Sequence, residues 1–431
     1  MAREKLILIP SDKMDHNKKE DRNEHGLVRM SKIARDSLGF DRSVEIYPET
    51  DSTEKRLGGA MLLEIFQAFS EDIKKARADG MTENDLKRAG FVTTKTFQKI
   101  TGSGDRIPQK NIWVTKDVND TVIGADPEFI LFDSDGNVVR ANNVLSFNGP
   151  IGCDGAMAEI RPQPAISPEG LVENIRVLLA DDKYVNSIKP YKWYAGCYYK
   201  DNNRDYPIGG HIHIGNPIQV ARIDSDRRVD FFKSFNRILD ELLSVPMIKI
   251  DGTISGRARR TECTMGKYGY FGEFRTCNGR LEHRTLSGMW LMHPTLSTLV
   301  LGTAKAIIDE VYRHVADKDF DLEYMFPRRF RGNSVWSEGF DQWGEIPLVA
   351  DIGCTISSKA MIDYLHKSDA NKISPKFLKA WRDRMRGLST YKMYSTYIEG
   401  LYDVLVNSVK TFNNCNKSIQ RNWLEGAKFL S

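Results

Sequence analysis

Short apolar runs, broken by glycine and proline, fill the middle of the chain from residue 121 to about residue 285. Side chains alternate between the two faces of a strand, and runs of this length with such breaks are typical of strands. The predicted strands lie within 121–133, 136–141, 155–162, 191–199, 209–215, 269–276 and 279–286. Residues 168–179 and 229–243 instead repeat apolar positions every three or four residues, which predicts helices covering one face of the sheet. We therefore expect an antiparallel or mixed sheet with covering helices.

Helical periodicity dominates after residue 286, whereas the first 110 residues mix strand and helix patterns. Helices are predicted within 299–315, 359–365, 375–386 and 394–412. Near the N-terminus, predicted strands at 5–9 and 43–48 flank an amphipathic stretch at 28–38, and an amphipathic helix is predicted over 59–78. The expected fold is therefore α+β, with a small α/β domain at 1–110, a sheet domain at 111–290 and a mainly helical portion at 291–431.

Two further patterns lie in the N-terminal segment. Residues 29–40 (RMSKIARDSLGF), followed by VEIYPE at 44–49, resemble one half of the double-psi or swapped-hairpin β-barrels of unfoldase N domains and AbrB-like proteins. Residues 83–101 have the rhythm of a helix-turn-helix, with Gly90 at the turn and Lys95 and Lys99 on the second helix. A helical hairpin that packs on its neighbour is the alternative that we favour, and residues 102–109 have the composition of a linker.

Composition narrows the class of protein. The 431 residues are 41% hydrophobic and 28% charged, which is typical of a soluble globular chain with a large core. The formal net charge of +4 is too small to indicate nucleic-acid binding, although basic clusters at 257–260 and 328–331 could form local patches. The six cysteines are far apart without a Cys-x-x-Cys pair, which favours reduced thiols, and we expect neither a signal peptide nor a membrane span.

Ionisable side chains occur two residues apart on the predicted strands. The pairs are Asp126 with Glu128, Glu159 with Arg161, His211 with His213, Glu273 with Arg275, and Arg280 and Arg284 on either side of Glu282. Residues at i and i+2 share one face of a strand, so each strand has one charged face and one apolar face. If these strands form one sheet, carboxylates, imidazoles and guanidinium groups meet on a common surface.

Two interpretations fit this surface. A ladder of cross-strand ion pairs explains any single Glu-x-Arg pair. Carboxylates with imidazole are also ligands of Mg²⁺ or Mn²⁺, and arginine forks bind phosphate oxygens. The sequence Gly-Gly-His-x-His-x-Gly adds glycines that allow a ligand to approach the backbone, so the combination favours a metal and phosphate site.

Four segments resemble, in order, the metal-binding motifs of the glutamine synthetase and glutamate–cysteine ligase superfamily. They are GADPEFILFD at 124–133, AEIRP at 158–162, GGHIHIG at 209–215 and GRLEHR at 279–284. The similarity is greatest to the phage-type carboxylate–amine (COOH·NH2) ligases, and it implies a glutamine-synthetase-like sheet over residues 120–290. No counterpart of the ammonia-site flap or the adenylylation loop is present, which argues against free ammonia and glutamate as substrates.

The resemblance implies a role for each matching residue. Glu128 and Glu159 resemble metal ligands, and Asp126 is a further ligand or supports one. His211 resembles the histidine that binds the metal near the nucleotide, His213 its neighbour on the phosphate, and Glu282 the last metal carboxylate. Arg284 and Arg280 resemble the arginines on the transferred phosphoryl group. Arg161 is a further catalytic candidate and Arg275 a further nucleotide-binding candidate by geometry alone.

Three functions remain open from the sequence. The first is an ATP-dependent ligase in which Mg²⁺ or Mn²⁺ supports phosphoryl transfer to a carboxylate and an amine then displaces phosphate. The second is a metal-dependent kinase of related fold, and the third is a non-catalytic virion or nucleic-acid-associated module. The ligase hypothesis implies ATP, a carboxylate and an amine, either of which can be carried by a peptide or protein. It favours neither a nucleic-acid partner nor a membrane, it is compatible with a homo-oligomer, and it predicts a cytoplasmic location, in the host cell if a phage encodes the chain.

Overall fold

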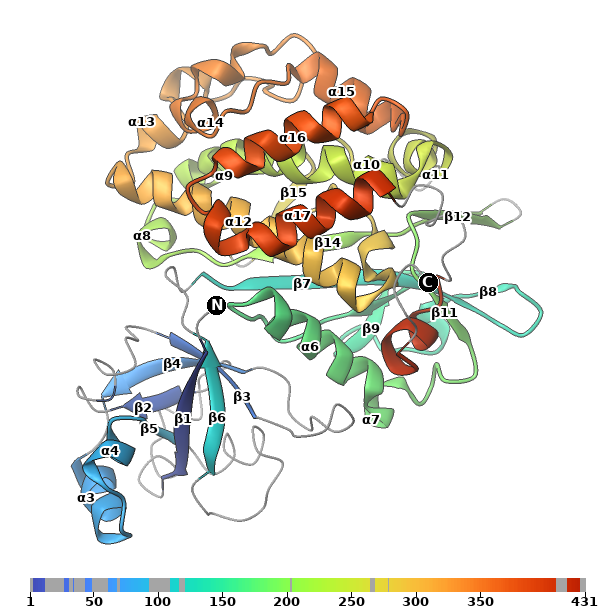
Figure 1. Cartoon of the computed structure of the whole chain (residues 1–431). Helices are drawn as coiled ribbons and strands as arrows, with labels where there is room; N and C mark the ends of the chain where they lie inside the picture. Colours follow the sequence, from blue (N-terminus) through green and yellow to red (C-terminus); the bar gives the residue numbers. More distant parts are fainter. Residues whose placement is uncertain are drawn as a thin grey trace. The chain divides into compact units, whose positions relative to one another are not determined.

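The computed structural model divides into two compact units (Figure 1). Unit 1 consists of Met1–Val122 and Gln163–Val177, and unit 2 of Ile123–Pro162 and Leu178–Ser431. The structure describes residues 3–11, 27–30, 34, 43–48, 61–67, 70–92, 109–115, 121–201, 204–263, 268–277, 279–407 and 417–426.

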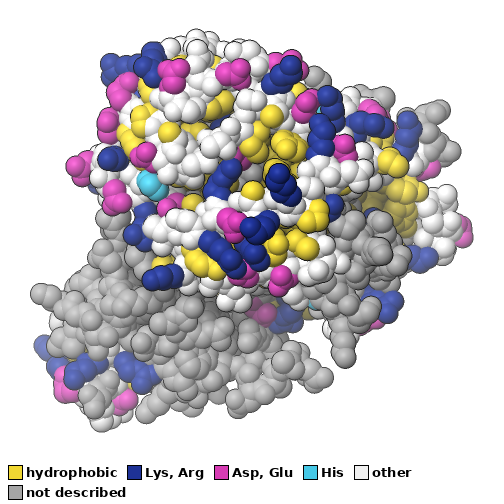
Figure 2. Space-filling view, turned by 45° about the horizontal axis from the view of Figure 1, so that its top comes forward, with side chains coloured by type: hydrophobic (Ala, Val, Ile, Leu, Met, Phe, Trp, Pro, Cys, Tyr) yellow, Lys and Arg dark blue, Asp and Glu magenta, His cyan; other side chains and the backbone are white. Residues whose placement is uncertain are grey.

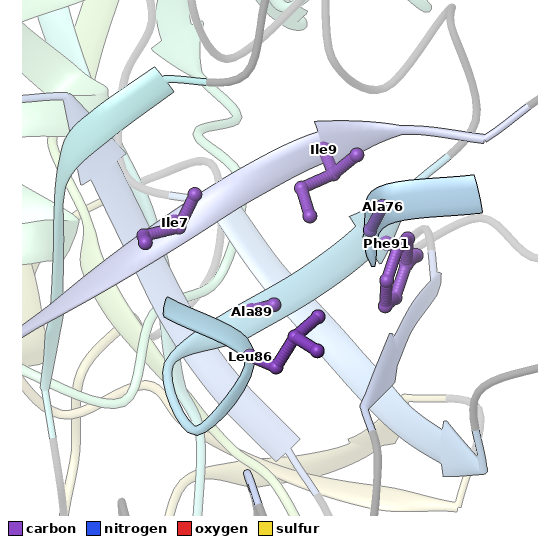
Figure 3. Close-up of a cluster of buried hydrophobic side chains, with 6 residues drawn as sticks. All are labelled: Ile7, Ile9, Ala76, Leu86, Ala89 and Phe91. Atoms are coloured by element: carbon purple, nitrogen blue, oxygen red, sulfur yellow. The ribbon is translucent and has the colours of Figure 1, made fainter. Parts of the chain in front are cut away.

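Unit 1 contains a closed six-stranded barrel in the strand order β1-β5-β2-β4-β3-β6. The strands are β1 (Arg3–Pro10), β2 (Leu27–Met30), β3 (Ser43–Pro48), β4 (Met61–Gln67), β5 (Ala89–Val92) and β6 (Gln109–Thr115). Two helices, α3 (Ser70–Ala78) and α4 (Glu83–Leu86), precede β5. Figure 3 shows how they contribute to one apolar cluster with β1 and β5, formed by Ile7, Ile9, Ala76, Leu86, Ala89 and Phe91.

The barrel corrects several predictions for this segment. Residues 61–67 form β4, so the helix predicted over 59–78 begins only at Ser70. The stretch predicted as amphipathic at 28–38 begins as strand β2. Short apolar runs fit a helix and a strand equally well, and pairing of β4 with both β2 and β3 decides for the strand. The segment at 29–49 contributes two described pieces, β2 and β3, and both are barrel strands.

Neither the helix-turn-helix nor the helical hairpin favoured over it is confirmed at the turn, where residues 89–92 form strand β5. Gly90 lies inside β5, where it pairs with Leu8 of β1 and Met30 of β2. Lys95, Lys99 and most of the predicted linker lie outside the described residues. Gln109, at the end of that linker, begins β6, which pairs with β1 and β3 and so belongs to the barrel.

Unit 2 is built on an antiparallel sheet in the order β15-β16-β14-β7-β10-β9, with β8 and β11 also paired to β7. Its strands are β7 (Ile123–Phe132), β8 (Val138–Val139), β9 (Ile151–Asp154), β10 (Met157–Ile160), β11 (Lys192–Tyr194), β14 (Gly210–Ile214), β15 (Phe274–Cys277) and β16 (Arg280–His283). A separate hairpin consists of β12 (Tyr198–Asp201) and β13 (Arg204–Pro207). The predicted α+β fold with an antiparallel sheet is confirmed.

The helices follow the predicted order, and those after β16 form the predicted helical portion (Figure 1). The α-helices are α6 (Pro168–Ala180), α7 (Asp182–Val185), α8 (Ile218–Ala221), α9 (Ser225–Leu239), α10 (Val245–Asp251), α11 (Thr253–Arg257), α12 (Pro294–Asp317), α13 (Leu322–Met325), α14 (Pro347–Asp351), α15 (Ser358–Lys367), α16 (Pro375–Gly387) and α17 (Tyr391–Asn407). Short 3₁₀ segments are η2 (Ala141–Asn143), η5 (Gly288–Met292), η6 (Arg328–Phe330) and η7 (Gln342–Glu345), and π-helical segments are η3 (Asp240–Ser244), η4 (Ala258–Glu262) and η8 (Gln420–Leu424). None of the described helices is both long and apolar enough to cross a membrane.

One histidine, His283, shows which side of the sheet faces α9. His283 of β16 is fully buried, and its ring nitrogens lie 2.7 Å from Asn236 Oδ1 and 2.8 Å from Ser244 Oγ. Successive residues of a strand point to opposite faces, so Glu282 points away from α9. The charged face of the sheet is therefore the face opposite to α9.

Candidate active site

Strand register brings the predicted site residues together on one face. His211 of β14 is opposite Asp126 of β7, His213 is opposite Glu282 of β16, and Glu128 is opposite Glu159 of β10. Paired residues of antiparallel strands point to the same side, with their Cβ atoms about 5 Å apart. The four motifs therefore contribute side chains to one surface of unit 2.

The centre of this surface is formed by Asp126, His211 and Glu282. His211 Nδ1 lies 3.2 Å from Asp126 Oδ1 and 3.6 Å from Glu282 Oε1. One ligand atom from each residue lies within 4.8 Å of the others. Within the described part of the chain, neither Asp126 Oδ1 nor His211 Nδ1 makes a hydrogen bond, although both atoms are buried. Buried polar atoms without partners are uncommon in proteins, and a cation between these atoms would satisfy both.

Tyr268 determines how His211 presents its nitrogen atoms. The Tyr268 hydroxyl lies 2.7 Å from Glu128 Oε1 and 2.7 Å from His211 Nε2. An ionised carboxylate only accepts hydrogen bonds, so the hydroxyl donates to Glu128 and accepts from the Nε2 hydrogen of His211. In the neutral imidazole this tautomer leaves the Nδ1 lone pair facing two carboxylates. Three acceptors that face one another fit the ligand set of Mg²⁺ or Mn²⁺.

The carboxylates differ in their electrostatic environment. Burial by itself raises the pKa of Asp126, but interactions with His211 and His213 outweigh it and hold the pKa below its usual value. The pKa of Glu128 is raised because burial outweighs His211, the Gly209 N–H and Tyr268. Asp126 therefore stays ionised over a wide pH range, and a nearby cation would also favour the ionised form of Glu128.

Two arginines contact Glu282, Arg275 from the neighbouring strand β15 and Arg284 from directly after β16. Arg275 Nη2 lies 2.7 Å and Arg284 Nη1 2.5 Å from Glu282 Oε1. Arg284 also pairs with Glu273 at 3.1 Å. The Arg275 side chain remains 54% exposed, so its guanidinium also reaches solvent. Arg280 is partly exposed opposite Cys277, and among the described residues it makes no ion pair.

Arg161 is engaged by protein acceptors. It pairs with Glu159, and its Nη1 donates to Phe147 O at 2.9 Å and to Gly149 O at 3.0 Å. A side chain at Gly152 would collide with this guanidinium. These contacts shape the loop before β9 and balance the charge of Glu159. They leave less of the guanidinium for a phosphate than the sequence analysis expected.

The two glycines before His211 make room for protein atoms. A Cβ atom at Gly209 would lie 2.5 Å from His211 Nε2 and 2.6 Å from the Tyr268 hydroxyl. A Cβ atom at Gly210 would collide with Ser287 O and the Trp290 indole nitrogen. The Gly209 N–H donates to Glu128 Oε2 at 2.6 Å. Gly209 therefore permits the Tyr268 contact, and Gly210 permits the close approach of Ser287 and Trp290.

Tyr268 is the central residue that the sequence analysis missed. Its ring lies between two guanidinium groups, 4.8 Å from Arg259 and 5.2 Å from Arg284. The sequence offered only a tyrosine in the glycine-containing segment before the strand of Glu273, which is a weak indication of function. The register of β14 and β16 does not involve Tyr268, so only the folded chain shows its place.

Neither basic cluster is an unpaired surface patch. Arg259 and Arg260 are buried, and Arg259 Nη1 donates to Thr285 O at 2.8 Å, so Arg257 is the exposed arginine of the 257–260 cluster, where it pairs with Glu262. In the second cluster, Arg328 pairs with Glu323, Arg329 with Glu345 and Arg331 with Asp226. Figure 2 shows Lys and Arg side chains interspersed with Asp and Glu on the described surface in view.

Comparison with known proteins identifies one family. Residues 123–334 match the sequence model described as phage phiEco32-like COOH.NH2 ligase-type 2. The matched segment includes every strand of the unit 2 sheet and all the site residues described above. The search of curated proteins gave no match. The family match confirms the resemblance and supports a carboxylate–amine ligase in general.

Proposed function

We propose that the protein, whose residues 123–334 match the model of phage phiEco32-like COOH.NH2 ligases of type 2, is an ATP-dependent ligase acting through an acyl phosphate. In this reaction the γ-phosphoryl group of ATP passes to a carboxylate oxygen, and ADP leaves. The amine nitrogen then bonds to the acyl carbon, the bond to phosphate breaks, and the amine loses a proton. Neither step requires a nucleophile from the protein.

The observation that carries this proposal is the unsatisfied pair of buried atoms, Asp126 Oδ1 and His211 Nδ1, beside Glu282. These residues would hold one divalent cation, and the opposed Glu128 and Glu159 would contribute to a second. Bound Mg²⁺ or Mn²⁺ would supply charge neutralisation to the nucleotide phosphates. The proposal thus gives a metal-binding role to all five ligands predicted from the sequence, which are Asp126, Glu128, Glu159, His211 and Glu282. It takes Asp126 as a direct ligand.

The remaining charged residues fit phosphate recognition. Arg275 lies on β15, Arg280 on β16 and Arg284 directly after β16, where their guanidinium groups can approach phosphate oxygens. His213 keeps 18% of its side chain exposed, and its Nε2 lies 2.9 Å from Asp126 Oδ2. That contact orients the His213 imidazole towards Asp126, one of the proposed metal ligands. Binding of ATP would bring phosphate oxygens against this row of donors and exclude water from the acyl phosphate.

Nucleotide turnover tests the proposal directly. We expect ADP release to require Mg²⁺ or Mn²⁺ and to rise when pools of carboxylates and amines are supplied together. Hydroxylamine should trap a hydroxamate from the carboxylate that supports ADP release, because it attacks the acyl phosphate in place of the amine. ADP release that no amine or hydroxylamine affects would favour a kinase. Absence of any nucleotide binding or turnover would favour the non-catalytic module.

Site variants make the same test specific. Glu282→Ala and Arg284→Ala should each lower turnover about 100-fold or more, which corresponds to about 3 kcal/mol of transition-state stabilisation. Arg328→Ala is the matched control, because this arginine is 75% exposed and pairs only with Glu323 among the described residues. Turnover of the Arg328 variant should equal that of the wild type. Equal loss in all three variants would remove the support for the assigned site.

A further inference from the structure

A second group of metal-ligating side chains lies beside the site described above, at the β14, β16 and β15 edge of the sheet. It consists of His213, Cys277 and Glu282, whose ligand atoms lie within 4.8 Å of one another. Cys277 has no part in the proposed ligase chemistry. Cys277 is a free thiol. The Cys277 and His213 side chains are partly exposed, whereas Glu282 is buried.

Strand register explains why these three residues meet. His213 of β14 and Arg275 of β15 are both opposite Glu282 of β16, one on each side. Cys277 follows Arg275 by two residues and therefore projects from the same face of β15. The cysteine is thus a diagonal neighbour of Glu282, at a separation within reach of side chains. The arrangement follows from backbone pairing and does not depend on a loop.

The donor atoms of this group differ from those of the neighbouring one. Asp126, His211 and Glu282 offer two oxygens and one nitrogen, which suits Mg²⁺ or Mn²⁺. Cys277, His213 and Glu282 offer sulfur, nitrogen and oxygen, which Mg²⁺ does not prefer. Three protein ligands of these types with one open position are typical of exposed Zn²⁺ sites.

We propose that His213, Cys277 and Glu282 form a binding site for a thiophilic divalent cation such as Zn²⁺. Tetrahedral zinc holds sulfur and nitrogen ligands about 3.6 Å apart, so the partly exposed Cys277 and His213 side chains have only a short distance to close. His213 would leave Asp126, and Glu282 would exchange a hydrogen bond from Arg275 for the metal. Binding deprotonates the thiol and releases a proton to solvent.

The shared carboxylate makes the two groups compete. Glu282 is common to both groups, so Zn²⁺ on the cysteine side would draw on this carboxylate and place a second positive charge beside the Asp126 and His211 side. We therefore expect Zn²⁺ to weaken Mn²⁺ binding and to inhibit turnover. This consequence rests on the proposed function, whereas the zinc site itself does not.

Cobalt provides a direct test with the full-length protein under reducing, oxygen-free conditions. Co²⁺ should bind with a thiolate-to-metal charge-transfer absorption band, and Zn²⁺ should displace it. Cys277→Ser should abolish the band and weaken Zn²⁺ binding at least tenfold, as measured by calorimetry, while circular dichroism stays unchanged. Cys263→Ser is the matched control, because Cys263 is another partly exposed cysteine and its variant should keep the band.

Two results would overturn the proposal. The first is a wild-type protein without a thiolate band at saturating Co²⁺, and the second is a band that survives in Cys277→Ser. Asp126→Asn separates this proposal from the ligase proposal, because it should abolish Mn²⁺ binding and leave the cobalt band in place. A band without ATP turnover would support the zinc site and contradict the ligase.

Discussion

Tyr268 joins two sets of residues that the sequence motifs keep apart. Its hydroxyl contacts Glu128 of the first motif and His211 of the third, each at 2.7 Å. Tyr268 is partly buried, and burial with the nearby Glu128 carboxylate raises the pKa of Tyr268 well above its usual value. The hydroxyl therefore remains protonated at neutral pH and can donate a hydrogen bond to Glu128.

Tyr268→Phe removes both hydrogen bonds and keeps the ring between Arg259 and Arg284. We expect the variant to bind Mn²⁺ about 10- to 100-fold more weakly, because His211 loses the partner that orients its Nδ1 lone pair. Titration followed by electron paramagnetic resonance measures this affinity. Tyr270→Phe is the matched control and should bind Mn²⁺ as the wild type does. Unchanged affinity in Tyr268→Phe would show that the hydroxyl does not position the histidine.

At the scale of elements, the junction between α12 and α17 depends on one carboxylate. Glu310 of α12 accepts hydrogen bonds from Ser389 N at 3.1 Å and from Thr390 N at 2.9 Å, which lie just before α17. It also contacts the Ser389 hydroxyl at 2.8 Å and the His314 ring at 3.2 Å. Burial raises the pKa of Glu310, but these hydrogen bonds outweigh it and lower the pKa to about 2.

Glu310→Gln should lower the free energy of unfolding by about 2 to 4 kcal/mol at pH 7, because an amide cannot accept from all these donors. A carboxyl with a lowered pKa in the folded state stabilises the protein above its unfolded pKa of about 4.5. That contribution is lost as the pH falls towards about 2, so the gap between variant and wild type should narrow over this range. Urea unfolding at pH 7, 4 and 3 measures the gap.

The exposed Glu338→Gln serves as the control for this charge removal. Its free energy of unfolding should stay within about 0.5 kcal/mol of the wild type at each pH. A Glu310 gap that does not change between pH 7 and pH 3 would contradict the ionised hydrogen-bond network.

At the scale of the whole molecule, the chain forms two units, and each unit has its own buried apolar residues. Phe91 of the unit 1 barrel is 2% exposed and belongs to the cluster in Figure 3. Phe235 of α9 in unit 2 is fully buried and stacks edge-on against Tyr312 of α12 at 5.3 Å. All the proposed metal ligands belong to unit 2. We expect the two units to unfold independently, with Mn²⁺ acting on unit 2.

Calorimetry of the full chain should show two unfolding transitions, and Mn²⁺ should raise the midpoint temperature of only one of them. Phe91→Ala should lower the free energy of unfolding of unit 1, seen in the transition that Mn²⁺ does not affect, by about 3 to 5 kcal/mol. Phe235→Ala should lower that of unit 2, seen in the other transition, by a similar amount. The two variants are controls for each other. A single transition that responds to both substitutions and to Mn²⁺ would show that unit 1 and the site are coupled.

Local pattern alone indicated the strands of the unit 2 sheet that carry the candidate site, and which side chains share a face of each of these strands. Alternation placed Asp126 with Glu128 on one face of β7 and His211 with His213 on one face of β14, because this property needs only neighbouring peptide units. The long helices α12 and α17 were also predicted, since each has enough turns for its periodicity to be seen. The order of the four motifs further indicated the family.

Tertiary structure decided what depends on residues far apart in the chain. Strand β4 was mistaken for a helix, because its apolar run becomes a strand only through pairing with β2 and β3. Tyr268 and Cys277 join the site only through cross-strand neighbours and a turn, which no local pattern encodes. The sequence by itself thus determined which side chains each element presents, whereas long-range pairing decided which of them meet, because register and barrel closure are properties of the whole fold.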